Sequence, residues 1–416
     1  MWLLRHNRRV AQPVQSQGAE PPYAGLRVLE LARVLAGPWI GQILADLGAE
    51  VIKVESPAGD ETRSWGPPFL TNADGSAADA AYFHSCNRGK ESLVLDFRDE
   101  ADRIRAVQLA READVLVENF KVGSLEKFGL DYASLARLNP GLVYCSISGF
   151  GQRGRYADRP GYDFVAQAMS GLMDITGEPG RPPQKVGVAV ADIVTGLYGL
   201  IGIQAALAER GRSGRGQHVD VALLDSTMGI LANQTMNFLV GDLTPTRMGN
   251  AHPNITPYQE FRTADGFIVV AVGNDTQFRC LCEALGCAAL ADDPRFAGNG
   301  SRVRNRSALE QALAPRLAAL RREDALARLE AARVPSGPIN TVPEALRDPN
   351  TRERAMVISS SADGYRAASI PGLATPIRFS RSGTNEGRPA PRLGSAGRLA
   401  TWRTSAADDP EEGGRA

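Results

Sequence analysis

The sequence lacks an excess of charge of either sign, and it lacks a long apolar run. Lys plus Arg and Asp plus Glu both number 47, so no net positive charge favours binding to nucleic acid. The longest apolar tract, residues 186–207, contains Asp192 and repeated glycines and is unlike a membrane span. These absences predict a soluble protein that has neither a nucleic acid nor a membrane as a partner.

Cysteine is also scarce, with five residues in a chain of 416. They are too few and too unevenly spaced for a disulfide framework, which indicates a reducing compartment. Cys280, Cys282 and Cys287 lie close together, but the run CLCEALGC has the pattern of one amphipathic helix. No His or second Cys pair nearby completes a tetrahedral zinc site. We therefore expect buried thiols, no metal site and a cytoplasmic protein.

Acidic residues are missing from the first 19 positions, which carry Arg5, Arg8 and Arg9. This composition resembles a weak mitochondrial transit peptide, and on that basis the mitochondrial matrix is the alternative location. The stretch is short, poor in Ser and without a long apolar face, which favours a disordered basic leader over residues 1–24. A polar tail over residues 401–416 is predicted to be disordered as well.

A regular alternation of strands and helices begins at Gly25. LRVLEL is a short apolar strand, WIGQILADLG has helical spacing, and AEVIKVE is a second strand. The alternation continues through SLVLDF, RIRAVQLAREA, DVLVENF, LVYCSISGF and VDVAL. This pattern predicts an α/β fold with a Rossmann-like large domain built on a parallel sheet. The first βα turn, ARVLAGPW, has no G-x-G-x-x-G fingerprint, so binding of NAD or FAD is disfavoured.

The pattern changes after Gly241. YQEFRT, ADG and FIVVAVG predict a β-hairpin, which is followed by helices. Residues 241–340 are therefore predicted to form a smaller α+β domain. Its last segment, VPSGPIN (334–340), has the Pro and Gly content of a linker. The large domain is then predicted to comprise residues 25–240 and 341–400.

Asp192 lies in VGVAVADIVTGLYGLIG, a segment that is otherwise small and apolar apart from Thr195. A helix that begins near Asp192 would place the carboxylate in its first turn, close to the positive end of the helix dipole. One interpretation is an N-cap that accepts hydrogen bonds from backbone N–H groups. The other is a partly buried carboxylate that stays ionised and attacks a thioester carbonyl.

Two loops are candidate binding segments. Residues 147–180 contain seven glycines, which allow the backbone to approach a ligand closely, although a plain connection with turns would have the same composition. The segment RMGNAHPNITPYQEF, residues 247–261, can present backbone N–H donors to a bound carboxylate. Its His252, taken alone, is more often a structural or surface histidine than a functional one.

Taken together, these segments resemble the class III CoA-transferases. That family includes formyl-CoA, carnitine and glutarate CoA-transferases and is related to α-methylacyl-CoA racemase. The motifs in order are VLAGPW, LADLGAEVIKVE with GDETRSWGPPF, ENF, SISGFG, PGYDFVAQAMSG, ADIVTG, GRGQHVDVALLDS, GNAHPNITPY and APRLG. The resemblance covers about residues 24–396, and the shared order of the motifs is more specific than any one of them.

The resemblance implies an interlocked homodimer, in which each large Rossmann-like domain includes both termini and each small domain is an insertion. It implies that the Asp of ADIVTG, Asp192, is the nucleophile. Coenzyme A and acyl-CoA are then substrates, and no cofactor is tightly bound. The CoA contacts that the resemblance implies are Val34, Leu35, Ala36, Asn87, Arg88, Lys90, Asn119, Phe120, Lys121, Lys127, Phe128, Ser148, Gly149 and Phe150. The substrate loops that it implies contain Tyr162, Gly249, Asn250 and His252.

Phosphate binding by this chain departs from the family pattern. Arg88, Lys90, Lys121 and Lys127 are the basic residues expected to hold the CoA phosphates. Ser56 stands where formyl-CoA transferase has a phosphate-binding Arg, and Ser148 replaces a Lys of the SIKGF loop. The C-terminal signature, usually LGEHT, here reads LGSAG.

Three functions are compatible with this fold. A transferase would use Asp192 to form an aspartyl anhydride with the acyl group. A racemase would need a His as second proton carrier, but Tyr162 occupies that position, and a phenol with a pKa of about 10 is a poor proton shuttle. A catalytically silent CoA-binding protein would not need an ionised group at Asp192. The motifs look most like the dicarboxylate branch, of which succinyl-CoA:glutarate CoA-transferase is an example, so we expect succinyl-CoA as donor and a short dicarboxylate as acceptor.

Overall fold

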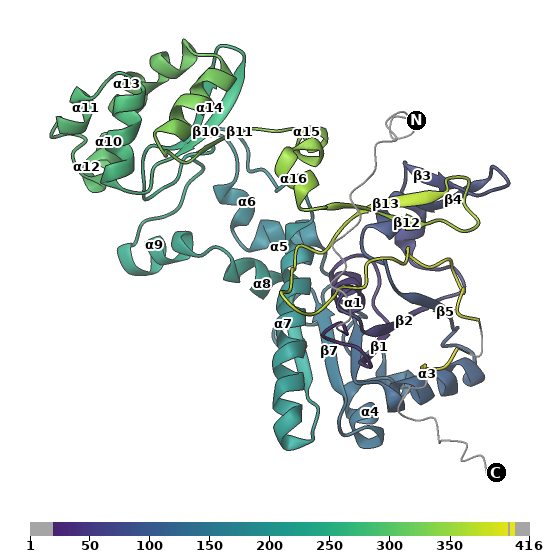
Figure 1. Ribbon diagram of the computed structural model, residues 1–416. Coiled ribbons are helices and arrows are strands. Elements are labelled where there is room, and N and C mark those ends of the chain that lie inside the picture. Colours follow the sequence, from purple (N-terminus) through teal and green to yellow (C-terminus); the bar gives the residue numbers. More distant parts are fainter. Residues whose placement is uncertain (1–19, 398–399, 404–416) are drawn as a thin grey trace. The chain divides into compact units, whose positions relative to one another are not determined.

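The computed structural model describes residues 20–397 and 400–403, which form two compact units (Figure 1). The first comprises the described residues up to Ser170, Gly187–Ala232 and the described residues from Asp348 onward. The second comprises Gly171–Val186 and Asn233–Arg347. The predicted small domain, 241–340, falls inside the second unit. The second unit also contains Gly171–Val186, which the sequence pattern assigned to the large domain.

The first unit is built on a six-stranded sheet with the order β5-β2-β1-β6-β7-β8, in which all neighbours pair in parallel. This confirms the predicted α/β fold. From β1 the chain builds one half of the sheet through β2 and β5, and the other half through β6, β7 and β8. The switch point therefore lies between β1 and β6, and ligands bind such sheets at the carboxyl ends of the strands. The strands are β1 (Arg27–Glu30), β2 (Glu50–Glu55), β5 (Glu91–Val94), β6 (Val115–Glu118), β7 (Val143–Ser148) and β8 (His218–Ala222).

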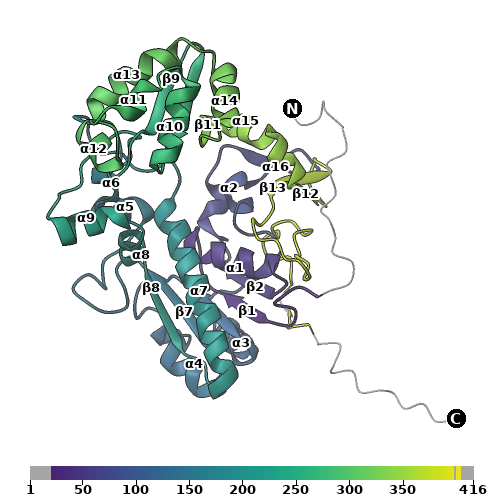
Figure 2. The same cartoon turned by 60° about the vertical axis from the view of Figure 1, so that its left-hand side comes forward.

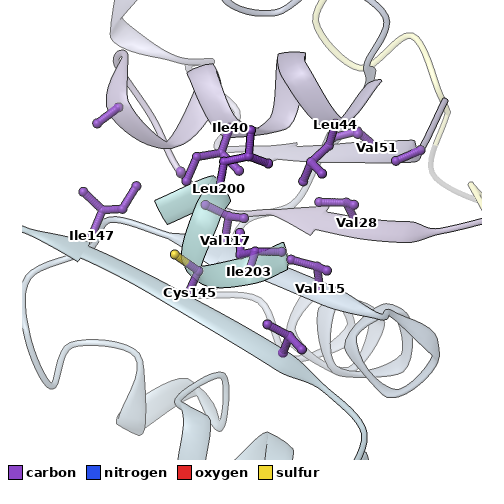
Figure 3. Close-up of a cluster of buried hydrophobic side chains, with 14 of the residues drawn as sticks. Val28, Ile40, Leu44, Val51, Val115, Val117, Cys145, Ile147, Leu200 and Ile203 are labelled. Atoms are coloured by element: carbon purple, nitrogen blue, oxygen red, sulfur yellow. The ribbon is translucent and has the colours of Figure 1, made fainter. Parts of the chain in front are cut away.

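Helices cover both faces of this sheet and form two separate cores. Because successive strand residues point to opposite faces, Val28 lies in one core and Leu29 in the other. Ile40 of α1 and Ile203 of α7 pack into the first core (Figure 3), while α3 and α4 pack into the second. The helices of the first unit are α1 (Ala36–Asp46), η2 (Glu61–Ser64), α2 (Ala81–His84), α3 (Glu100–Glu112), η3 (Glu126–Phe128), α4 (Tyr132–Leu138), α5 (Asp163–Met169), α7 (Val190–Ser213), α8 (Leu223–Gly229) and α16 (Pro349–Glu353).

The long helix α7 lies close against α1 because glycines occupy the contact. A Cβ at Gly196 would lie 2.8 Å from the carbonyl oxygen of Ala36, and a Cβ at Gly199 would lie 2.6 Å from Cδ1 of Ile40. By length and composition alone, α7 is also apolar enough to span a membrane. Its packing on α1 and β7 accounts for that apolar character within the unit.

We expect Gly196→Ala to destabilise the protein, because the new methyl group would press on a backbone carbonyl that cannot move aside. Such overpacking costs about 1–3 kcal/mol, which exceeds the roughly 1 kcal/mol of helix propensity that Ala gains over Gly. Gly211→Ala in the same helix is the control, because a Cβ there has no neighbour within 4 Å, and it should stabilise. Urea unfolding followed by circular dichroism measures both variants. A Gly196→Ala protein as stable as the parent would contradict this packing.

Two β-hairpins of the first unit were not predicted from the sequence. They are β3 (Phe69–Thr71) with β4 (Ala77–Ala80), and β12 (Val357–Ser361) with β13 (Ser369–Leu373). A β-bridge between Asn72 and Tyr365 connects the two hairpins. Residues far apart in sequence therefore support each other beside the main sheet, which short-range periodicity does not reveal.

The predicted ends of the chain need correction where the structure describes them. The prediction of disorder over 401–416 is wrong at Trp402, whose side chain is buried in the second core and donates from Nε1 to the Leu109 carbonyl at 3.2 Å. The predicted leader likewise ends before Tyr23, whose N–H donates to the Leu47 carbonyl at 2.9 Å. Residues 1–19, 398–399 and 404–416 lie outside the described residues.

The second unit contains the three-stranded antiparallel sheet β11-β10-β9, with helices grouped around it (Figure 2). The hairpin of β9 (Tyr258–Thr263) and β10 (Gly266–Ala271) is confirmed. The expected linker in 334–340 is instead the edge strand β11 (Ser336–Pro338), and Pro338 is tolerated there because an edge strand pairs on one side only. The helices are α6 (Leu172–Ile175), α9 (Asn233–Gly241), α10 (Asp275–Ala284), α11 (Ala289–Asp292), α12 (Asn299–Arg304), α13 (Arg306–Ala318), α14 (Arg322–Ala331) and α15 (Val342–Arg347).

Candidate active site

Asp192 is the third residue of α7, a half-buried position in the first turn. The N-cap of this helix is Ala189, which makes no side-chain capping bond. The interpretation of Asp192 as an N-cap is therefore wrong. The dipole at a helix start stabilises negative charge, and a half-buried side chain in the first turn can still be reached by a substrate.

A second carboxylate, Asp163, holds the beginning of α7. It is the first residue of α5, and its Oδ1 accepts the N–H of Ala191 at 2.8 Å. Its Oδ2 accepts a hydrogen bond from Nε2 of Gln167 at 2.8 Å. The helix that carries Asp192 is thus capped by a residue from another helix, and this fixes the orientation of its first turn.

The negative charge of Asp163 affects the ionisation of Asp192. The pKa of Asp192 is raised to about 7, first by burial and second by the negative charge of Asp163. Near neutral pH, Asp192 is therefore divided between its acid form and its carboxylate form. Only the carboxylate is a nucleophile, so small changes in this environment change the reactive fraction.

If Asp192 is the nucleophile, Asp163→Asn should move the pH profile of kcat/KM to lower pH. The amide oxygen can still accept the Ala191 N–H, but the negative charge that raises the pKa of Asp192 is removed. In the parent, kcat/KM should rise with pH through about 7. The variant should retain a larger share of its pH 8 activity at pH 6. Glu112→Gln in α3 is the control for a change of net charge, and an unshifted Asp163→Asn profile would contradict the coupling.

Tyr82 is a third member of this site. Burial and then the negative charge of Asp192 raise the pKa of Tyr82 to about 12, so the phenol stays protonated at neutral pH. Its ring lies edge-on to Trp65, with the centroids 5.4 Å apart. A protonated phenol whose pKa responds to the charge of Asp192 is a candidate donor to an oxyanion that forms there.

The predicted CoA turn lies between β1 and α1, at the switch point of the sheet. Leu35 is the N-cap of α1 and Ala36 is its first residue. Val34 has a φ of 70°, an uncommon conformation for a β-branched residue. Asn119 holds the preceding residue, accepting the Arg33 N–H at 2.9 Å and donating to the Arg33 carbonyl at 2.7 Å. The turn therefore has a fixed shape.

Beside this turn is a cavity of about 240 Å³. It lies past the carboxyl ends of β1, β2 and β5, and it combines an apolar lining with two arginines at residues 33 and 98. The predicted contacts Phe120 and Phe128 line it, together with Ser56. The other lining residues, which the sequence alone did not single out, are Leu31, Arg33, Val54, Glu55, Leu95, Asp96, Phe97 and Arg98.

The structure gives Arg88 and Lys90 a different role from the expected one. Arg88 donates to both carboxylate oxygens of Asp46, at 3.0 and 2.6 Å, and to the Leu373 carbonyl at 2.7 Å. Lys90 is fully buried, with Nζ 2.8 Å from Oε2 of Glu30. Both cations are oriented into the unit and already paired, which differs from the expectation that they bind CoA phosphates. The expected contact Asn87 is buried too, and its Oδ1 accepts a hydrogen bond from Lys90 at 2.9 Å.

Lys121 and Lys127, in contrast, are exposed. Lys127 lies over the Phe128 ring, with Nζ 4.8 Å from the centroid. Both side chains remain predicted phosphate contacts. They are charged and accessible, as binding of a flexible polyphosphate requires.

The glycine-rich loop after β7 is shaped by close backbone contacts. Ser148 accepts the N–H of Gly151 at 2.8 Å. A Cβ on Gly149 would lie 2.6 Å from the Cα of Gly161, so two segments of the loop backbone touch there and leave no room for a side chain. Phe150 lies close to Tyr156, with the ring centroids 5.7 Å apart. Tyr162, at the other end of the loop, is 64% exposed.

The remaining predicted loop residues, Gly249, Asn250 and His252, belong to the second unit and line a cavity of about 280 Å³ there. Gly249 has a φ of 59°, and its N–H donates to the Gly177 carbonyl at 3.0 Å. His252 accepts the N–H of Asn254 through Nδ1 at 3.1 Å, and burial followed by the nearby Arg306 cation lowers its pKa. A neutral, hydrogen-bonded His252 has the features of a structural histidine.

Comparison with known proteins identifies the family. The model of the family described as CoA-transferase family III matches residues 23–396. The chain belongs to this family. It is 52% identical over 376 residues to the succinate–glutarate CoA-transferase of Agrobacterium fabrum, with 90% of this chain and 94% of that protein covered. It is 40% identical over 374 residues to the human succinyl-CoA:glutarate CoA-transferase, with coverage of 90% and 84%.

A solved structure agrees with this membership of CoA-transferase family III. The crystal structure of a CAIB/BAIF family protein from Brucella suis is 54% identical in sequence and superposes with a TM-score of 0.80, covering 91% of this chain and 98% of that one. The resemblance noted from the motifs is thereby confirmed. The protein is a CoA-transferase, and its substrates are CoA thioesters and carboxylates.

Two site residues of this CoA-transferase were not identified from the sequence. Asp163 lies in the motif PGYDFVAQAMSG, where it follows Tyr162, but only the fold brings it to the start of α7. Tyr82 lies two residues before His84, the first residue of HSCNRGK, and nothing in its local pattern relates it to Asp192. Within the described residues, no group of three or more His, Cys, Asp or Glu side chains is arranged to hold a metal ion.

Proposed function

We propose that this protein transfers CoA from succinyl-CoA to glutarate or a similarly short dicarboxylate, through an acyl anhydride on Asp192. The observation that carries the proposal is the position of Asp192, half-buried in the first turn of a helix and next to a second carboxylate. The substrates follow from the relatives, since the bacterial protein at 52% identity is named for succinate and glutarate. We infer that Asp192 is the nucleophile because anhydride formation needs a carboxylate that a substrate can reach but bulk water reaches less easily, as a half-buried position allows.

The reaction proceeds by exchange of acyl partners on one carboxylate. An Asp192 oxygen attacks the thioester carbonyl of the donor, the C–S bond breaks, and CoA leaves as a thiolate. The carboxylate of the acceptor attacks the Asp192 carbonyl carbon of the anhydride and releases succinate, which leaves a new anhydride on Asp192. The CoA thiolate then attacks the acceptor acyl carbon, forming the product thioester and regenerating the Asp192 carboxylate.

Each attack produces an oxyanion, which needs donors close by. The positive end of the α7 dipole would favour an oxyanion there, and Tyr82 would supply a phenol that burial keeps protonated. The burial that raises the pKa of Asp192 also limits the access of water, which would otherwise hydrolyse the anhydride. Burial thus has two effects. It lowers the fraction of Asp192 that is ionised at neutral pH, and it protects the anhydride from hydrolysis.

We propose that CoA lies along the carboxyl edge of the sheet in the first unit. The cavity beside the βα turn would take the adenine ring against the aromatic cluster of Phe97, Phe120 and Phe128 that lines it. Arg33 and Arg98 line the same cavity; each pairs with a carboxylate, Glu61 and Asp96, but unlike Arg88 and Lys90 both side chains are exposed, so they would bind phosphates together with Lys121 and Lys127. These four residues would take the phosphate-binding role first expected of Arg88 and Lys90. They would also supply the positive charge that is missing at Ser56.

We also propose that the enzyme is a homodimer. Helices α5, α7 and α8 contact one another and expose large apolar side chains, which on a monomer would be an unusually apolar surface. These residues include Phe164, Met169, Leu197, Ile201 and Met228. Light scattering after size exclusion should give twice the mass of 44.5 kDa for the parent. Ile201→Asp should lower that mass, and a monomeric parent would contradict the proposal.

The substrate proposal is tested with succinyl-CoA as donor and a panel of acids, separating the CoA esters by chromatography. Glutarate and its close dicarboxylate analogues should give the highest kcat/KM. Higher values with formate or carnitine would contradict the assignment. Exchange of the α-proton of a branched acyl-CoA in deuterated water, without transfer of CoA, would support a racemase instead.

A further inference from the structure

The βα turn that begins α1 contains a half-buried residue in a strained conformation. Val34 has a φ of 70°, in the left-handed region that β-branched residues rarely adopt. Such a conformation persists only where the surroundings fix it, and it is found most often at functional sites. The question is which residue fixes Val34.

Asp60 contacts the backbone of Val34 directly. Its Oδ2 and Oδ1 accept the Val34 N–H at 3.2 and 3.4 Å. Its Oδ1 also accepts hydrogen bonds from the N–H and the Oγ1 of Thr62, at 3.0 and 2.8 Å. Asp60 is 2% exposed, so these bonds form away from water. The carboxylate therefore links the turn to η2 across 26 residues of sequence.

A buried lysine holds Asp60 in turn. Lys53 Nζ lies 3.0 Å from Oδ2 of Asp60 and 3.1 Å from Oε1 of Glu30, and it donates to the Ala32 carbonyl at 2.7 Å. The Lys53 side chain is fully buried. The Lys53 ammonium thus fixes the position of the Asp60 carboxylate. The same lysine also holds the Ala32 carbonyl, two residues before Val34.

We propose that Asp60 is a positioning residue for CoA, which holds Val34 in the left-handed conformation so that the βα turn is preformed before the ligand arrives. This rests on the proposed binding of CoA at that turn. Preorganisation lowers the cost of ordering the site on binding, so loss of Asp60 should weaken CoA binding more than it slows the chemistry at Asp192.

Asp60 also neutralises Lys53 and caps η2 through its bonds from Thr62, and a purely structural role would consist of these two functions alone. The two roles differ in their dependence on Val34. If Asp60 acts by holding φ at position 34, a residue that adopts positive φ freely makes it dispensable. If Asp60 only balances the buried charge, the identity of residue 34 is irrelevant.

The test is a double-mutant cycle of Asp60→Asn and Val34→Gly in the full chain, with succinyl-CoA as donor. In the Asp60→Asn variant an NH2 group replaces one carboxylate oxygen. That group is itself a donor, so it cannot accept the hydrogen bonds that Asp60 accepts from Val34, Thr62 or Lys53. In the parent background, Asp60→Asn should raise KM for succinyl-CoA about tenfold or more, with kcat within about threefold. In the Val34→Gly background, the same substitution should raise KM less than about threefold. Calorimetric Kd values for CoA should follow the KM values.

The matched control is Asp79→Asn, which breaks an ion pair with Arg63 in the same unit but does not contact the turn. It should leave KM for succinyl-CoA within about twofold of the parent. If Asp60→Asn does not fold, as judged by circular dichroism, Val34→Pro replaces it. Proline fixes φ near −65° and removes the N–H, so this variant should raise KM at least tenfold.

Equal effects of Asp60→Asn in both Val34 backgrounds, or normal KM in Val34→Pro, would overturn the positioning role while leaving CoA transfer intact. A loss of kcat without a change in KM would overturn it as well. If the parent binds CoA and shows the Kd pattern of the cycle, but transfers no CoA to any acid, the proposed function fails and the positioning role stands. The two outcomes are therefore distinguishable.

Discussion

Asp192→Ala is expected to lower kcat for CoA transfer by about a thousandfold or more, because the variant has no carboxylate to accept the acyl group. Asp192→Asn should do the same while keeping the size of the side chain. Its amide is a very poor nucleophile, so the comparison separates chemistry from packing. Both variants should bind CoA with a Kd close to that of the parent, since neither alters the βα turn or the cavity beside it.

Trapping of the intermediate complements the kinetics. Incubation of the parent with succinyl-CoA and hydroxylamine should convert Asp192 to a hydroxamate, which peptide mass spectrometry locates. The Asp192 variants should give no such product. CoA transfer that survives either substitution, or a hydroxamate formed on Asp163, would mean that the nucleophile has been assigned to the wrong residue.

Glu30→Gln is expected to destabilise the first unit by about 3–5 kcal/mol, the usual cost of removing one partner from a buried ion pair. Glu30 is fully buried between two lysines, with Lys53 3.1 Å and Lys90 2.8 Å away. Burial lowers the pKa of Lys90, and Glu30 opposes that effect. Burial would also lower the pKa of Lys53, but the charges of Glu30 and Asp60 outweigh it and raise the value. Lys90 therefore depends on Glu30 more than Lys53 does.

Urea unfolding at pH 7 measures this loss. The control is Glu61→Gln. Glu61 forms an exposed ion pair with Arg33, and the side chains of Glu61 and Arg33 are 45% and 44% accessible. That substitution should cost less than about 1 kcal/mol. Glu30→Gln combined with Lys90→Met should recover part of the stability, because the unpaired cation is then gone as well. A stability unchanged by Glu30→Gln would show that the buried lysines need no counter-charge.

The main sheet was predictable because its strands and helices carry their periodicity in short segments. In AEVIKVE, the residues Val51, Ile52 and Val54 are β-branched and favour a strand, and the segment forms β2 as expected. VPSGPIN was not recognised as a strand, since the three residues of β11 are held by pairing with β10 and have little strand propensity of their own. Trp402 was likewise missed, because its place in the second core depends on a helix that lies about 290 residues earlier in the chain.

The site was predictable only where a motif identified it. Asp192 was selected by its family motif, and local physical reasoning alone favoured a helix cap. Arg88 and Lys90 show the converse error: basic residues in a binding motif suggested phosphate contacts, but Asp46 and Glu30 pair with them inside the unit. Which of several cations in a motif faces the ligand depends on tertiary packing, and one sequence does not reveal it.

The glycine contact between α7 and α1 affects the position of Asp192 relative to the βα turn. Asp192 lies in the first turn of one of these helices, and the turn containing Val34 begins the other, so the distance between the proposed nucleophile and the proposed CoA-binding turn depends on Gly196 and Gly199. Reaction rates fall steeply when reacting atoms are displaced by about 1 Å. Substitutions at these two glycines, deep in the core and remote from any substrate, should therefore be recognisable as losses in kcat even in variants that remain folded.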